Sequence, residues 1–139
     1  MDRARFVFAR LAVAAGFLSA VADRFGLWGP AGAPRAAWGN FEAFTAYTAR
    51  LLPFIGAAYI SLFAWTATVA EIVLAVLLIA GVRPRETAVA SAALLLSFAL
   101  AMTWSLGIKA PLDYSVFAAA GAAWLTGADE TVRAEAVVR

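Results

Sequence analysis

The stretch that decides the fold is Leu51–Val82, which reads LLPFIGAAYISLFAWTATVAEIVLAVLLIAGV. It contains a single charged side chain, Glu71. A helix that crosses a bilayer needs about 20 consecutive, mostly apolar residues. The run is continuous rather than alternating, which favours a helix over a strand of a membrane barrel. The sequence therefore predicts a membrane-spanning helix over 53–82.

Apolar stretches on both sides of this run predict further spans. Thr87–Ile108 and Tyr114–Ala128 contain no charged residue, and the stretch from Phe6 to Phe25 contains only three. Short links between consecutive spans make them antiparallel neighbours. We predict an all-α, single-domain protein over 1–139, an antiparallel bundle with spans at 6–26, 53–82, 86–108 and 111–128.

The composition agrees with a membrane protein and excludes several classes of site. Hydrophobic residues make up 64% of the 139 residues and charged residues 14%, against about 25% in a soluble domain. Cys and His are both absent, which excludes disulfides, zinc-thiolate sites, iron–sulfur clusters and imidazole ligands for haem or copper. The net charge of +2 without a basic cluster argues against nucleic acid. We expect no metal site and no intrinsic cofactor.

The distribution of Lys and Arg predicts the orientation, because cytoplasmic segments carry the excess. Seven of the eleven fall at the start, in the second connection and in the polar tail 129–139: Arg3, Arg5, Arg10, Arg83, Arg85, Arg133 and Arg139. We therefore expect both termini in the cytoplasm of a bacterial cell, with the bundle in the inner membrane. Ala20-Val21-Ala22 also resembles a signal-peptide cleavage site, but Arg10 interrupts the apolar run before it, which favours a retained span.

The first connection, 27–52, is the only long one. Asn40 is a good N-cap, Glu42 would lie in the first turn, and Arg50 near the end, so a short helix is expected in its second half. Trp28 and Trp38 precede it and would anchor it at headgroup depth. This interfacial helix either only seals the bundle or forms a lid over a lipid or quinone site.

Glu71 is the most informative candidate residue. A carboxylate in the middle of a span faces the bundle interior and needs a partner. It is either a proton-carrying or ligand-binding group, or part of a buried pair that fixes helix register. Arg10 either extends to the inner interface or reaches Glu71, and Tyr59 and Trp104 add polar tips. We predict a buried polar or ligand site from Glu71, Arg10, Tyr59 and Trp104.

A second set of polar residues lies at the outer ends of the spans. Asp23 and Arg24 end the first span, Lys109 and Asp113 lie between the third and fourth, and Tyr114 follows. These five residues are expected at one level, near the outer headgroups. They form either a polar entrance to the bundle or ordinary interfacial charge.

Several of these residues also carry a family resemblance. Arg10-Leu11 opens the first span, Glu71 precedes Gly81-x-Arg83, and KAPLDYSVF at 109–117 opens the fourth span. In these features the chain resembles the DoxX-like membrane proteins. The resemblance implies a four-helix integral membrane protein, associated as a small subunit with a terminal quinol oxidase or another membrane oxidoreductase. Quinone or lipid is the ligand it implies.

Three functions are consistent with these features. The first is a non-catalytic subunit or partner of a membrane oxidoreductase, in contact with the bilayer and with other redox subunits or a second copy of itself. The alternative is a small oligomeric transporter or proton-coupled carrier that uses Glu71. A stand-alone enzyme ranks third, because no nucleophile and base stand out as a pair.

Overall fold

A computed structural model describes residues 3–127 of the protein. These residues form six helices and no strand: α1 (Arg3–Arg24), α2 (Phe41–Leu51), α3 (Ala57–Ala80), α4 (Pro84–Leu106), α5 (Lys109–Asp113) and α6 (Val116–Leu125). Three of them, α1, α3 and α4, are long and apolar enough to cross a membrane. The all-α prediction is confirmed, and these helices fall within a few residues of the first three predicted spans. The predicted polar tail 129–139, with Arg133 and Arg139, lies outside the described residues.

The region of the fourth predicted span, 111–128, is divided between two helices. Ser115, between α5 and α6, has a left-handed backbone with φ of 55°. A residue in this conformation cannot continue a right-handed helix. The 10 residues of α6 extend about 15 Å, about half the thickness of a bilayer core. The apolar pattern thus continues through this region although the helix does not.

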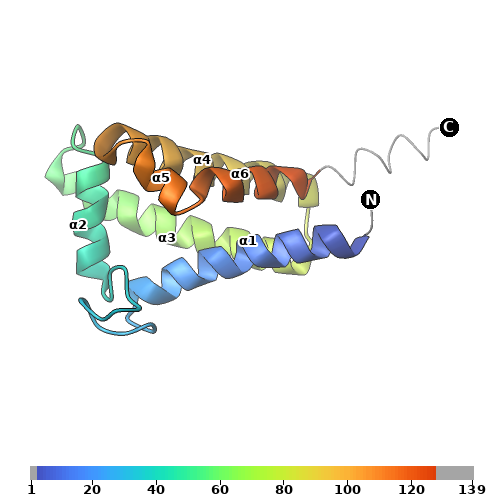
Figure 1. Ribbon diagram of the computed structural model, residues 1–139, viewed down its shortest axis with the longest axis horizontal. Coiled ribbons are helices and arrows are strands. Elements are labelled where there is room, and N and C mark those ends of the chain that lie inside the picture. The colour runs from blue at the N-terminus through green and yellow to red at the C-terminus, as the bar shows by residue number, and fades with distance from the viewer. Residues whose placement is uncertain (1–2, 128–139) are drawn as a thin grey trace.

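The helices lie mainly along one direction. Figure 1 shows α1, α3, α4 and α6 along the long axis of the molecule, with α2 across one end. The closest pairings are α1 with α3 and α4 with α6. The core includes Phe17 of α1 and Leu78 of α3, and fully buried alanines such as Ala75 and Ala123 let the helices approach closely.

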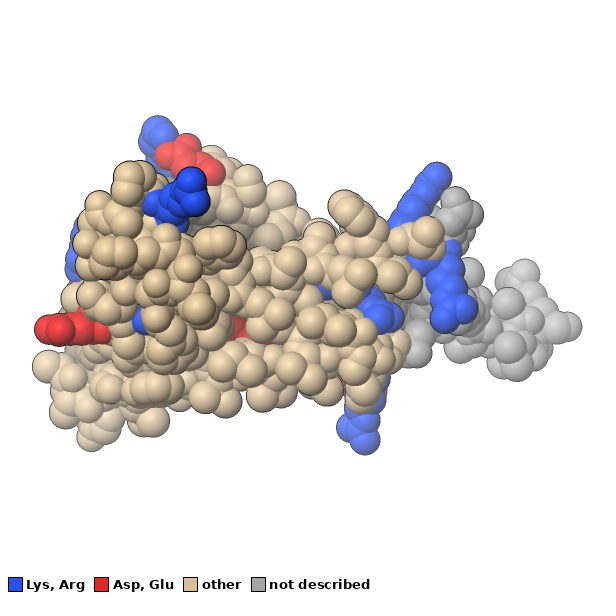
Figure 2. Space-filling view, turned by 90° about the horizontal axis from the view of Figure 1, so that it is seen from below, with Lys and Arg blue, Asp and Glu red and all other residues tan. Residues whose placement is uncertain are grey.

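The outer surface of the long helices is apolar. Large side chains such as Leu62, Val69 and Val76 of α3 and Leu100 of α4 are exposed. Figure 2 shows charged side chains gathered toward the two ends, with a mostly uncharged middle. An exposed apolar surface of this size is typical of helices that contact lipid.

Two local features of the sequence set helix ends near the candidate sites. The Asn40 side chain accepts a hydrogen bond of 2.7 Å from the backbone N–H of Ala43, so the predicted N-cap of α2 is confirmed. At the other end of the molecule, Gly81 ends α3 in the left-handed conformation, and its N–H donates to the carbonyl of Leu77. Glycine adopts this conformation without the steric cost of a Cβ.

Candidate functional site

Glu71 lies on the buried face of α3 and forms an ion pair with Arg24 at the end of α1. Arg24 Nη1 is 2.5 Å from Glu71 Oε2, and the two side chains are 2% and 3% exposed. The same Nη1 donates a hydrogen bond of 2.8 Å to Thr68 Oγ1, one turn earlier on α3. A charge in this position needs a partner, because an isolated buried charge is strongly unfavourable. Arg24 supplies that partner, so neither charge is left uncompensated.

An aromatic roof formed by Phe44 and Trp38 covers the guanidinium of Arg24. Its central carbon lies 3.7 Å from the ring centroid of Phe44 on α2 and 5.5 Å from that of Trp38 in the preceding loop. The two rings contact each other edge to face at 5.0 Å. A desolvated cation over an aromatic face gains about 2 kcal/mol. Arg24 therefore joins α1 to α2 as well as to α3.

Asp23 fastens the loop between α1 and α2 beside this pair. Its Oδ2 accepts hydrogen bonds from the backbone N–H groups of Ala37 at 3.0 Å and Trp38 at 2.8 Å. The side chain is buried. Adjacent residues at the end of α1 thus hold two different segments, because Asp23 positions the Trp38 backbone and Arg24 contacts the Trp38 ring.

Arg10, which the sequence suggested as a partner for Glu71, makes different contacts. Its Nε donates to the carbonyl of Leu78 at 3.0 Å, and its Nη2 to the carbonyl of Ile79 at 3.5 Å. These carbonyls belong to the last turn of α3, where a cation is favoured by the helix dipole. The guanidinium also lies against Gly81, where an added Cβ would be 2.8 Å from Nη2. Arg10 therefore caps the end of α3.

The two remaining residues of the predicted buried site lie on the surface. Tyr59 is 61% exposed and Trp104 is 81% exposed. Of the four residues proposed from the sequence, only Glu71 belongs to the buried ion pair. Its partner, Arg24, belongs to the residues that were predicted to form the outer entrance.

The five residues of the predicted outer entrance do not form one cluster. Asp23 and Arg24 are buried, whereas Lys109 and Asp113 form an exposed ion pair one helical turn apart on α5. Tyr114, which follows them, is also exposed. The structure therefore separates the buried residues Asp23 and Arg24 from the exposed residues Lys109, Asp113 and Tyr114.

The burial of Arg24 follows from the offset of α1 relative to α3. Arg24 ends α1 but contacts Thr68 and Glu71, which lie about 17 and 21 Å along α3 from its first residue, Ala57. The first turns of α3 thus extend beyond the end of α1. A run of loop from Phe25 to Asn40 follows α1 and leads into α2, which crosses this end of the molecule (Figure 1).

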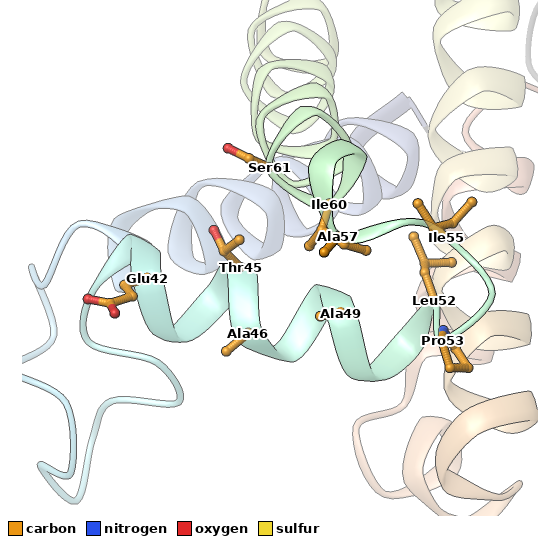
Figure 3. A pocket seen from close by; sticks show the side chains of 10 residues that line it. All are labelled: Glu42, Thr45, Ala46, Ala49, Leu52, Pro53, Ile55, Ala57, Ile60 and Ser61. Atoms are coloured by element: carbon orange, nitrogen blue, oxygen red, sulfur yellow. The ribbon is translucent and has the colours of Figure 1, made fainter.

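A shallow groove of about 430 Å³ lies between α2 and the start of α3 (Figure 3). Ten residues line it: Glu42, Thr45, Ala46, Ala49, Leu52, Pro53, Ile55, Ala57, Ile60 and Ser61. Most are small or apolar, and neither Glu71 nor Arg24 is among them. The groove suits an apolar chain better than a polar substrate, and it does not open onto the ion pair.

No group of three or more acidic or other metal-binding side chains lies together within residues 3–127. The carboxylates of Asp23 and Glu71 are engaged by backbone N–H groups and by Arg24, respectively. The described site therefore consists of an ion pair, a hydroxyl and aromatic rings. This arrangement can join helices, but it does not pair a nucleophile with a base.

No protein-family model, curated protein or solved structure matches the chain. The resemblance to the DoxX-like proteins therefore stays a prediction from the sequence. The function of the chain is accordingly inferred from the geometry of the described residues together with that prediction.

Proposed function

We propose that this chain is a DoxX-like integral membrane protein that acts as a non-catalytic subunit of, or partner to, a membrane oxidoreductase such as a quinol oxidase. In this proposal α1, α3, α4 and the α5–α6 segment are the four spans of an antiparallel bundle. The termini lie in the cytoplasm and the bundle in a bacterial inner membrane.

The surface and the helix lengths support the membrane part of this proposal. The three long helices expose large apolar side chains, and α6, although short, packs along α4. With α5 before it, the last segment covers a greater depth than α6 alone, and α5 carries the exposed pair of Lys109 and Asp113. Arg83 and Arg85 lie in and just after the link between α3 and α4, consistent with a cytoplasmic side there.

The observation that carries the accessory role is the closed Arg24–Glu71 pair. An acid used in catalysis or transport must exchange protons or ligands, whereas this carboxylate is paired with a guanidinium under two aromatic rings. Such a pair holds α1, α2 and α3 in register. With no Cys or His in the chain, redox centres in the assembly would belong to other subunits. Lipid or quinone would contact the apolar surface or the groove.

Purification from native membranes tests this function. The tagged protein is extracted in a mild detergent, and its co-purifying proteins, quinones and lipids are identified against untagged membranes as the control. The expected result is a stoichiometric oxidoreductase subunit, with or without bound quinone. A protein that repeatedly purifies without any redox subunit or quinone would contradict the accessory role.

A proton-coupled carrier is the second candidate, because Glu71 is an acid buried in a helix long enough to span a membrane. Its pairing with Arg24 beneath two aromatic rings disfavours this function, because the acid of a carrier exchanges its proton with water on both sides of the membrane. Proton flux into proteoliposomes distinguishes the two functions. Flux that is present in the native chain and lost in Glu71→Gln would establish the carrier, and flux equal to that of empty liposomes would exclude it.

A further inference from the structure

The way α2 is attached to the rest of the molecule carries an inference beyond the accessory role. Only Phe44 and Thr48 of its 11 residues are buried. The groove in Figure 3 runs beneath the helix, between Thr45, Ala46 and Ala49 on one side and the first turns of α3 on the other. Because few of its side chains are buried and a groove runs along it, the position of α2 depends on a small number of contacts.

One attachment is the aromatic roof near the start of α2. Phe44 lies on the guanidinium of Arg24, and Trp38 reaches the same cation from the loop before the helix. The position of that guanidinium is fixed by Glu71 and Thr68 of α3. The roof is therefore attached to α3 through Arg24.

The same end of α2 also contacts α3 directly, because Phe41 stacks on Trp65 with the ring centroids 4.2 Å apart. The third attachment lies at the opposite end of α2. Ser105 Oγ of α4 donates a hydrogen bond of 2.7 Å to the carbonyl of Leu51, the last residue of the helix. A connection of five residues, 52–56, then leads into α3. The end of α2 at Leu51 stays close to α3 even when its other end moves, because this short connection joins the two helices.

We propose that α2 is a hinged lid and that the Arg24–Glu71 ion pair is its latch. The hinge is the 51–56 end, and the latched end is the one that carries Phe44. When the ion pair separates, Arg24 loses its fixed position and the roof loses the cation on which it rests. The start of α2 is then held to α3 by the Phe41–Trp65 stack alone, so it moves away from α3 more readily and the groove beneath it widens.

The hydrogen bonding of Arg24 agrees with a latch that can be released. Its Nε is buried without a hydrogen-bond partner, so the guanidinium is only partly satisfied in the closed state. A partly satisfied buried network is held less firmly than a complete one. Asp23 remains as a second tie, because it binds the backbone of the loop independently of Glu71. Opening therefore begins at α2 rather than in the loop held by Asp23.

Hydrogen exchange on the whole protein in lipid nanodiscs tests the latch. In Glu71→Gln the carboxylate charge is removed, and the backbone amides of Phe41–Leu51 are expected to exchange about tenfold faster than in the native chain. The amides in the middle of α4 are expected to stay as protected as before. The matched control is Glu86→Gln, which removes an exposed acid from the first turn of α4 and leaves both α2 and the latch intact, so the exchange of α2 should be unchanged.

A second variant covers the case in which Glu71→Gln fails to fold. Arg24→Leu combined with Glu71→Leu leaves no unpaired charge but still removes the latch, so α2 should again exchange faster. Because the chain has no Cys, spin labels at Ala46→Cys and Ser61→Cys, on the two sides of the groove, report the same opening as a longer distance.

Two results would overturn the proposal. One is unchanged exchange of α2 in both latch variants. The other is an equal acceleration in α2, α3 and α4, which would mean that the ion pair stabilises the whole bundle and that α2 has no separate motion. Neither measurement depends on a partner subunit, so the latch and the accessory role can fail independently.

Discussion

Replacing Gly81 with Ala tests the contact between Arg10 of α1 and the last turn of α3, at the end of the molecule away from α2. Gly81 has φ of 69° and lies against the guanidinium of Arg10. The substitution adds one methyl group, which meets both the backbone conformation and the neighbouring side chain. We expect Gly81→Ala to lower the free energy of unfolding by about 2–3 kcal/mol, as the sum of two costs.

The first cost is conformational, about 1 kcal/mol for a Cβ in the left-handed region. The second is steric, because the new Cβ would lie 2.8 Å from Arg10 Nη2 and 3.0 Å from Nη1. The flexible end of Arg10 would have to move and would weaken its hydrogen bonds to the carbonyls of Leu78 and Ile79. Buried hydrogen bonds from a charged group contribute about 1.5–3 kcal/mol to stability. Because Arg10 is partly exposed, weakening its hydrogen bonds should lower the free energy of unfolding by about 1–2 kcal/mol.

Two comparisons separate these costs. In an Arg10→Ala background the steric cost is absent, so Gly81→Ala should show the conformational cost alone, about 1 kcal/mol. Gly121, within α6, has open space and no positive φ, so Gly121→Ala should not destabilise the protein. Reversible unfolding of these variants in one bicelle composition provides the measurement. Equal losses for Gly81→Ala in the native and Arg10→Ala backgrounds would refute the role assigned to Arg10.

Three further predictions concern α2 and its surroundings. Asn40→Ala removes the acceptor for the Ala43 N–H and should destabilise α2 by about 1 kcal/mol, seen as faster amide exchange in its first turn, with Asn40→Ser retaining the native rate. Burial and the neighbouring Tyr114 raise the pKa of Tyr47, so the folded state disfavours the phenolate form. The free energy of unfolding should therefore be constant below about pH 10 and fall as the pH rises further. Tyr47→Phe should reduce this fall. Neutralising the exposed pair with Lys109→Gln and Asp113→Asn should leave the unfolding midpoint unchanged, because solvent screens such a pair; a clear decrease would contradict its assignment as a surface interaction.

The sequence was informative wherever a local pattern controls the structure. The uncharged run after Thr87 and the single acid in Leu51–Val82 were enough to predict α4 and α3, because continuous apolar length is a property of the segment alone. Asn40 identified the start of α2 for the same reason, since an N-cap acts over three residues.

Long-range pairing could not be predicted in the same way. Glu71 was expected to be buried with a partner, but the partner depends on how far α1 extends beside α3. From the sequence, Arg24 was expected with the charges near the outer headgroups, and pairing with Glu71 was one of two possibilities considered for Arg10. The structure offsets α1 relative to α3, which brings Arg24 to Glu71 and takes Arg10 to the end of α3.

The break in the helix before α6 could not be predicted from the sequence pattern either. The apolar run that follows Tyr114 predicts a continuous span, and nothing in the hydropathy marks Ser115 as a left-handed residue. Trp38 was recognised only as an interfacial anchor, and Phe44 only as part of the short helix expected after Asn40. Their contact with Arg24 depends on the path of a long loop, for which residue spacing gives no guide.

The central structural claim is that Arg24 and Glu71 depend on each other, and a double-mutant cycle measures this dependence directly. Arg24→Leu and Glu71→Leu should each lower the free energy of unfolding by about 3–5 kcal/mol, because each leaves one buried charge unpaired. The double variant leaves no charge and should lose far less than the sum of the two single losses. Single losses that add in the double variant would show that the two side chains do not interact, and would contradict the account.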